Sequence, residues 1–255
     1  MALQALDHVV IMVPDLEAAI RDYTELGFTV VRGGSHPAGT HNALIAFADG
    51  AYVELIAFER KNPQHRWWDV AQKGGGLIDF CMRTDDLTGD RETFRAAGVE
   101  TAIAPGERVR PDGYRLRWTL AQPVPPHAFV APFLIEDETP REERVAGEHR
   151  HRNAVRGIAT IIIAVPDVAA PRRWWSAVLR QHGEELRRED MLARGVRFRA
   201  GPHALELMAP EQASSPLSAR LKTRGAGPWS MALKTSASPH TLDEDKARAR
   251  IMLVP

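Results

Sequence analysis

The first 58 residues contain four apolar runs and one amphipathic segment. Alternating and β-branched apolar positions predict strands at residues 7–13, 28–31, 42–47 and 52–58. Apolar residues at helical spacing predict a helix over residues 16–26, which begins after the capping residue Asp15 and ends at Gly27. The order is therefore strand, helix and three strands, a unit that we call βαβββ.

A second unit of the same kind is predicted over residues 77–136. A strand at 77–83, a helix at 86–97 and strands at 99–103, 114–120 and 133–136 follow one another. Residues 139–156 are charged and lack apolar periodicity, which predicts a solvated linker.

The first unit then repeats at a fixed offset in the sequence. Adding 152 maps residues 13–15, Val-Pro-Asp, onto 165–167, and it maps Glu54-Leu55 onto Glu206-Leu207. An offset of 151 maps the strand at 76–84 onto 227–235. One ungapped offset at both ends of a unit indicates an internal repeat. The last 20 residues leave room only for a short helix or turn and a strand at 251–254, so the fourth unit is truncated.

The predicted fold is α+β, with tandem βαβββ modules. Modules 1 and 2 occupy residues 1–138, the charged linker residues 139–156, and module 3 with the truncated module 4 residues 157–255. Because strand side chains alternate between faces, four ionisable residues are predicted on the sheet face that carries no helix. They are His8, Glu54, Asp79 and Glu136. Buried ionisable groups are costly unless they are paired, so their convergence favours a bound cation or proton transfer.

Two of these residues have a purely structural alternative. Glu54 could form an ion pair with Arg83 or Arg117, and Asp79 could pair with Arg83, two residues along the same face. Cys81 on that face is interpreted as a small buried hydrophobic residue.

Composition narrows the class of protein. Lys+Arg and Asp+Glu both number 33, and the zero net charge argues against nucleic acid or an anionic membrane as the main partner. The single cysteine excludes an internal disulfide framework and fits a reducing compartment. No signal peptide and no apolar stretch long enough to span a bilayer is visible. We therefore expect a cytoplasmic protein that handles a small molecule.

Four βαβββ units in tandem resemble the vicinal oxygen chelate superfamily. His8 opening one strand and residues 52–55, Tyr-Val-Glu-Leu, in another carry the resemblance, and residues 39–44, 76–80, 117–118 and 132–136 resemble its glyoxalase-like group more narrowly. The resemblance implies two cup-shaped mixed sheets with helices on the outer face. It also implies a divalent ion (Mn²⁺, Mg²⁺, Ni²⁺ or Zn²⁺) held by His8, Glu54, Asp79 and Glu136.

The mirror positions in the second half, Thr160, Glu206 and Ser230, lack the imidazole. Hydroxyl groups are weak metal ligands, so the chemistry should be confined to the first half. We expect Glu206 to be satisfied by Arg197 or Arg199 on a neighbouring strand, or by solvent.

The leading hypothesis is a metal-dependent lyase, isomerase or hydrolase acting on a small oxygen-rich metabolite. Glu54, Asp79 and His41 are its candidate catalytic residues, and Tyr52, Arg83 and Trp118 its candidate ligand-binding residues. His41 could instead be only a turn residue, and the Trp67-Trp68 pair could pack in the core or roof the cup. The alternative function is a non-catalytic protein of the same fold that sequesters a small molecule. A homodimer is a further expectation.

Overall fold

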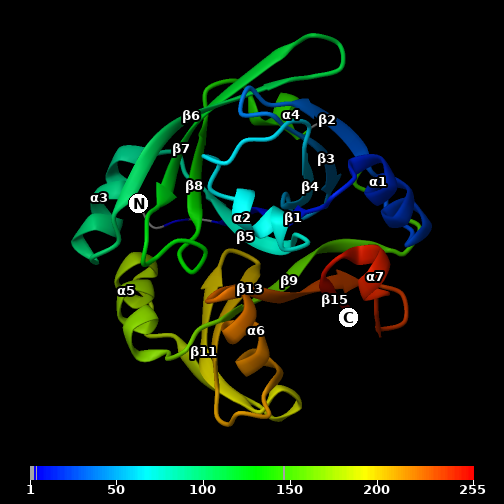
Figure 1. Cartoon of the computed structure of the whole chain (residues 1–255). Coiled ribbons are helices and arrows are strands. Elements are labelled where there is room, and N and C mark those ends of the chain that lie inside the picture. The colour runs from blue at the N-terminus through cyan, green and yellow to red at the C-terminus, as the bar shows by residue number, and fades with distance from the viewer. Residues whose placement is uncertain (1–2, 4, 146) are drawn as a thin grey trace.

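The computed structural model describes residues 3, 5–145 and 147–255. The first half forms a closed barrel of eight strands in the order β1-β4-β3-β2-β6-β7-β8-β5 (Figure 1). The strands are β1 (Ala5–Met12), β2 (Val31–Ser35), β3 (Thr40–Ala46), β4 (Tyr52–Phe58), β5 (Gly76–Arg83), β6 (Thr101–Val109), β7 (Arg115–Pro123) and β8 (Phe133–Asp137). The helices of this half are α1 (Leu16–Glu25), α2 (Trp68–Gln72), α3 (Leu87–Ala96) and α4 (Arg141–Arg144).

The second half forms a seven-stranded sheet in the order β10-β11-β12-β9-β13-β15-β14. Its strands are β9 (Val155–Ala164), β10 (Glu184–Arg188), β11 (Ala193–Ala200), β12 (His203–Pro210), β13 (Gly227–Thr235), β14 (His240–Thr241) and β15 (Arg250–Val254). Its helices are α5 (Ala169–Leu179), the 3₁₀ turn η1 (Glu189–Met191), α6 (Pro216–Arg224) and α7 (Glu244–Ala247). The predicted α+β fold is confirmed, and the fourth unit is reduced to β13, a short helix and two short strands.

Helix α1 forms where the sequence predicts it. The carboxylate of Asp15 accepts a hydrogen bond from the Ala18 amide at 2.9 Å, and Gly27 follows the helix with a φ of +93°. The next strand differs from the prediction, because it occupies residues 31–35 rather than 28–31. Gly33 and Gly34 lie within it at a register shift.

The internal repeat is preserved in the pairing of the strands. His8 lies opposite Tyr52 between β1 and β4, and the repeat-related Thr160 lies opposite Ala204 between β9 and β12. The bulge between β1 and β5, which leaves Ile78 unpaired, recurs between β9 and β13 at the related Trp229. The prediction that residues 158–209 repeat the unit of residues 6–57 is therefore confirmed in the order of the strands and in the register of the first strand with the fourth.

The outer faces of the barrel and of the second sheet share one apolar core. Trp175 of α5 is fully buried and stacks on Phe80 of the barrel at 6.3 Å and on Phe198 of the second sheet at 6.0 Å. The Tyr23 hydroxyl of α1 donates to the Ala247 carbonyl of α7 at 2.6 Å. The second half thus supports the back of the barrel and leaves the barrel interior free.

The concave face of the second sheet is covered by helix α6. Leu217 is fully buried there against Ile162 of β9 and Met208 of β12, with Leu221 packed beside them. This differs from the expectation of helices on the outer faces only. The second cup that the family resemblance implies is therefore filled by apolar side chains.

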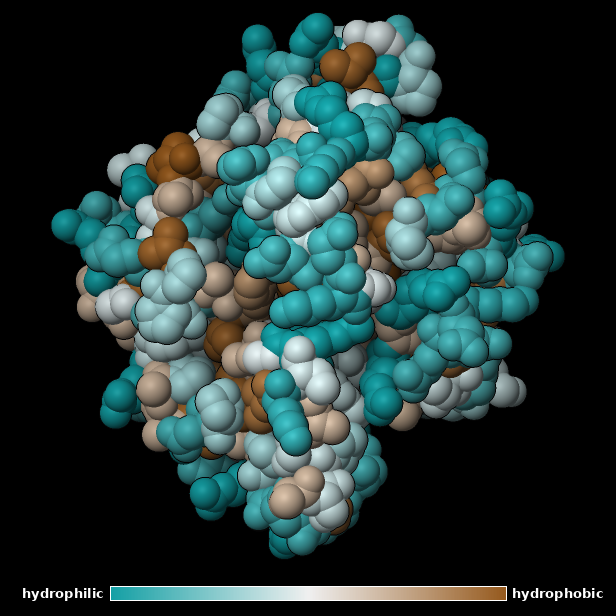
Figure 2. Space-filling model, viewed as in Figure 1, coloured by the Kyte–Doolittle hydropathy of each residue, from teal (hydrophilic) through white to brown (hydrophobic). Residues whose placement is uncertain are grey.

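Residues 139–156 are not solvated throughout. Arg144 is only 1% exposed, and His151 is held between the Ala46 carbonyl at 3.0 Å and the Thr29 amide at 3.0 Å. The solvated-linker interpretation is wrong at these positions because paired charges and solvated charges look alike in sequence. Figure 2 shows the surface in the same view, where hydrophilic residues cover most of the face and hydrophobic residues form small separate groups. In the described part of the chain, no helix has both the length and the apolarity to span a membrane.

Candidate functional site

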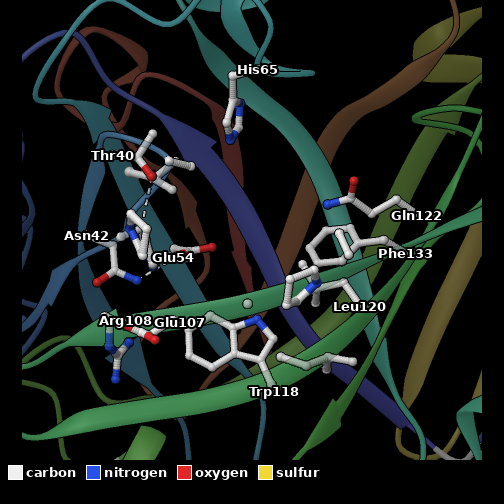
Figure 3. A pocket seen from close by; sticks show the side chains of 18 of the residues that line it. Thr40, Asn42, Glu54, His65, Glu107, Arg108, Trp118, Leu120, Gln122 and Phe133 are labelled. Carbon is white, nitrogen blue, oxygen red and sulfur yellow. Dashed lines mark hydrogen bonds between the residues drawn. The ribbon is translucent and has the colours of Figure 1, made fainter.

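The barrel encloses a cavity of about 650 Å³, within the size range of small-molecule sites. Polar side chains gather on β3 and β4, and large apolar side chains gather on β7 and β8 (Figure 3). The polar group includes His8, Thr40, Asn42 and Glu54, and the apolar group includes Trp118, Leu120 and Phe133, with Arg108 close to Trp118. The cavity can therefore hold an apolar body and bind a polar end.

His8 lies on the inner face of β1 and is held in one orientation. Its Nδ1 atom is 2.7 Å from Oδ1 of Asp7, and its ring stacks on Tyr52 with centroids 4.6 Å apart. The edge of Phe133 packs against the same ring at 5.3 Å. This leaves the Nε2 atom directed at Glu54, whose Oε2 atom is 3.5 Å away.

Glu54 is buried and has one oxygen committed and one facing the histidine. Oε1 accepts a hydrogen bond from Nδ2 of Asn42 at 2.6 Å. Oε2 faces Nε2 of His8 at a distance longer than a direct hydrogen bond. Either group could thus exchange a proton with a molecule bound at this point. The predicted convergence of His8 and Glu54 is confirmed.

A buried arginine fixes Asp7, and through it His8. Arg144 donates to both carboxylate oxygens of Asp7 at 3.1 Å, to Asp137 at 2.9 Å and to the Tyr52 hydroxyl at 2.7 Å. Burial raises the pKa of Asp7, but Arg144, His8 and Arg141 together outweigh it and hold that pKa well below its ordinary value. Asp7 therefore stays ionised and accepts the Nδ1 proton of His8.

Asp79 does not line the cavity. It is fully buried, and its Oδ2 atom accepts from Nε1 of Trp67 at 2.9 Å and lies 3.1 Å from a terminal nitrogen of Arg66. Burial raises the pKa of Asp79 more strongly than Arg66 and Trp67 lower it. Its partner is thus Arg66 rather than the expected Arg83, and it anchors two residues that do line the cavity.

The strand-parity prediction is wrong for Glu136. Phe133 and Ile135 line the cavity, whereas Glu136 accepts a hydrogen bond from the Leu87 amide at the start of α3, at 3.2 Å. Because β8 begins with three consecutive apolar residues, its sequence does not indicate which of its two faces points into the barrel. Glu136 is not among the residues that line the cavity.

Of the other predicted residues, Tyr52 and Trp118 line the cavity, whereas His41 and Arg83 do not. Thr40 and Asn42 point inward, so the alternating His41 points outward, where its Nδ1 atom is 3.5 Å from Glu59. Arg83 lies at the far end of β5.

The cavity residues that sequence reasoning missed include His36, His65, Arg66 and Arg108. The first three lie in loops, where no periodicity indicates direction. Arg108 lies near the end of β6, beyond the predicted strand at 99–103, because Pro105 and Gly106 interrupt the apolar pattern. His36 is bonded to Thr40 at 2.9 Å and meets the Trp118 ring edge-on at 6.2 Å.

Acid should destabilise the protein through these histidines. Burial lowers the pKa of His36 and of His65 from 6.5 to about 4, with Arg66 adding to the effect at His65 and Arg108 to that at His36. A folded-state pKa below the unfolded one means that stability is fully present above pH 6.5 and falls as the pH drops toward 4. We expect the urea midpoint to fall between pH 7.5 and 4.5, and to fall less in His65→Gln. An unchanged pH dependence in that variant would contradict the assignment.

The predicted donor set, His8, Glu54, Asp79 and Glu136, does not converge on one point and so does not fit a resident divalent ion. Catalytic zinc sites supply three protein ligands, and only His8 and Glu54 present facing atoms to the cavity from the expected set. The structure also brings possible ligand atoms of Asp7, His8 and Cys81 within 4.8 Å of one another. However, both carboxylate oxygens of Asp7 already accept hydrogen bonds from Arg144. Burial also raises the pKa of the Cys81 thiol well above its ordinary value, which disfavours the thiolate that binds metal. Arg108, the cavity arginine without a carboxylate within 4.0 Å among the described residues, opposes a bound cation further.

Metal content gives a direct check of this disagreement with the sequence-based expectation. Protein purified without a histidine tag should hold much less than one equivalent of Mn, Ni or Zn per chain. Added Zn²⁺ or Mn²⁺ should raise the melting temperature no more in wild type than in His8→Ala. A stoichiometric metal that is lost in His8→Ala would contradict the argument.

Comparisons with known proteins agree with this architecture. The model of a family described as a glyoxalase-like domain matches residues 6–179. A hypothetical protein from Staphylococcus aureus has a TM-score of 0.73 at 15% identity, covering 98% of each chain. A mutant of 4-hydroxymandelate synthase from Streptomyces coelicolor has a TM-score of 0.60 at 13% identity, covering 93% of this chain and 72% of its own. At these identities the likeness shows the fold alone. No curated protein matches the sequence.

Proposed function

The chain belongs to the glyoxalase-like domain family, within the vicinal oxygen chelate superfamily, and on this premise we propose that its barrel catalyses proton transfer on a small molecule. The reaction class is an isomerisation or a lyase-type elimination. One observation carries the proposal: Nε2 of His8 and Oε2 of Glu54 face each other across 3.5 Å at the cavity wall. Their remaining polar atoms are held by Asp7 and Asn42.

Asp7, His8 and Glu54 have separate roles in the proposed reaction. Asp7 accepts the Nδ1 proton of His8 and so leaves Nε2 for the cavity. One member of the His8–Glu54 pair removes a proton from a substrate carbon or oxygen. The proton returns at a neighbouring atom in an isomerisation, or a leaving group departs with the electron pair in an elimination. General acid–base catalysis of this kind contributes roughly 10²–10⁴-fold to rate.

Burial of the pair supports the proposal. His8 is 3% and Glu54 is 7% exposed, and apolar side chains of β7 and β8 line the same cavity. A site of low polarity strengthens electrostatic interactions with a reacting group. The second sheet offers no equivalent, since Glu206 is bound by Arg197 at 2.7 and 2.9 Å and by Arg188 at 3.3 Å. The expectation for Arg197 is thus confirmed.

The alternative function is sequestration of a small molecule without chemistry. The broad apolar wall and the incomplete metal donor set favour it. The two functions differ in what happens to a bound molecule.

The test recovers bound molecules after incubation. Compounds that raise the melting temperature of wild type are incubated with stoichiometric protein dialysed against EDTA, and are then analysed by mass spectrometry and NMR. We expect an isomer or an elimination product with wild type and unchanged compound with His8→Gln. Unchanged compound from both proteins would support sequestration instead. Turnover that needs added metal would restore the metal-dependent hypothesis.

A further inference from the structure

Arg108 is a buried cation without a counter-ion. It lies on β6 and is only 3% exposed, yet its side chain lines the cavity. One terminal nitrogen donates to the Arg144 carbonyl at 2.5 Å, and Nε is buried with no hydrogen-bond partner. Among the described residues, no carboxylate lies within 4.0 Å of its guanidinium. Arginine is rarely buried unless it is paired.

Each of the other cavity arginines has a carboxylate within 4.0 Å. Arg66 lies 3.1 Å from Asp79, Arg117 lies 3.9 Å from Glu138, and Arg144 lies 3.1 Å from Asp7. Of the other lining acids, Glu107 is bound by Arg115 and Glu54 by Asn42. No carboxylate of the described cavity wall therefore forms an ion pair with Arg108, although the charge of Glu54 acts on it from beyond 4.0 Å.

An aromatic platform lies beside this cation. Trp118 on β7 pairs with Gly106 on β6, two residues before Arg108 on the same face. A Cβ atom at Gly106 would stand 1.9 Å from Nε1 of Trp118, so only glycine admits the indole against the β6 backbone. The glycine thus fixes a flat ring on the cavity wall near the unpaired guanidinium (Figure 3).

We propose that the cavity binds a small carboxylate with an aromatic or other planar body, whose carboxylate pairs with Arg108 and whose body lies against Trp118. A guanidinium and a carboxylate match in charge and in hydrogen-bond geometry. The assignment names the substrate class of the proposed proton-transfer site and rests on that proposal only for the chemistry that follows binding.

A matched pair of probes tests the charge requirement. Binding of 2-naphthoate and of its neutral isostere 2-naphthamide is measured by titration calorimetry and ligand-observed NMR. We expect wild type to prefer the carboxylate at least about tenfold. Arg108→Met should remove that preference while retaining the amide, and Arg108→Lys should keep part of it. Arg117→Gln, at a lining arginine that is 66% exposed, should keep all of it.

Several outcomes overturn the assignment. Equal binding of the two probes by wild type, or a preference retained in folded Arg108→Met, removes Arg108 as the anion site. Binding of neither probe by folded wild type rejects the ligand class. Arg108→Lys serves where Arg108→Met does not fold. Carboxylate binding without chemical change would sink the proton-transfer proposal alone, whereas His8-dependent turnover of uncharged compounds only would sink this assignment alone.

Discussion

Replacing Arg144 by methionine should lower the free energy of unfolding by about 3–5 kcal/mol. The change leaves Asp7 buried without its main partner. It also removes the hydrogen bonds that Arg144 donates to Asp137 and to the Tyr52 hydroxyl. A buried charge that loses its partner retains its full desolvation cost, which is why the loss exceeds that of a surface ion pair. Urea unfolding of both proteins at pH 7.5 measures the difference.

Arg141→Met is the matched control. Arg141 also contacts Asp7 at 3.1 Å, but its side chain is 23% exposed. We expect a loss on the order of 1 kcal/mol or less there. Equal losses from the two variants would show that Arg144 does not organise the network behind His8.

Glu54→Gln should lower the rate of proton transfer by at least about 100-fold with little effect on folding. The glutamine keeps an oxygen for the Asn42 amide but can no longer take up a proton next to His8. Rates are compared under saturating substrate, with thermal unfolding as the check on folding.

The repeat provides the control for this variant. Glu206 occupies the equivalent position in the second sheet, where two arginines bind it. Glu206→Gln should leave the rate largely unchanged in protein that remains folded. A comparable loss of rate from Glu206→Gln would show that the active site does not lie in the first half of the chain.

The fold could be predicted because the repeat and the strand pattern agree. The offset of 152 survives as strand register, with Val10 opposite Glu54 and Ile162 opposite Glu206. Strand parity placed His8 and Glu54 correctly, since β1 and β4 pair in unbroken register over residues 8–12 and 52–56.

Parity failed where a strand was irregular or uniformly apolar. The bulge in β5 turns Ile78 inward beside Val10, although alternation places it on the helix side. In β8 the apolar run hid the fact that Phe133 and Ile135 face the cavity. A single bulge changes the face of every later residue, and sequence pattern carries no record of it.

The supporting charges could not be predicted from local sequence at all. Arg144 reaches Asp7 across 137 residues of chain, and Arg66 reaches Asp79 from a loop. Such pairs depend on how the barrel closes. The same holds for Arg108, because the sequence does not show that its side chain lacks an ion-pair partner.

Solvent deuterium incorporation tests the His8–Glu54 site most directly. A bound compound is held in D₂O with protein dialysed against EDTA, and its exchangeable C–H signals are followed by proton NMR. We expect wild type to replace one such proton with deuterium, and His8→Gln to leave it in place while still binding the compound. Exchange at an equal rate in His8→Gln, or exchange that appears only when a divalent metal is restored, would contradict proton transfer by the side chains of the barrel.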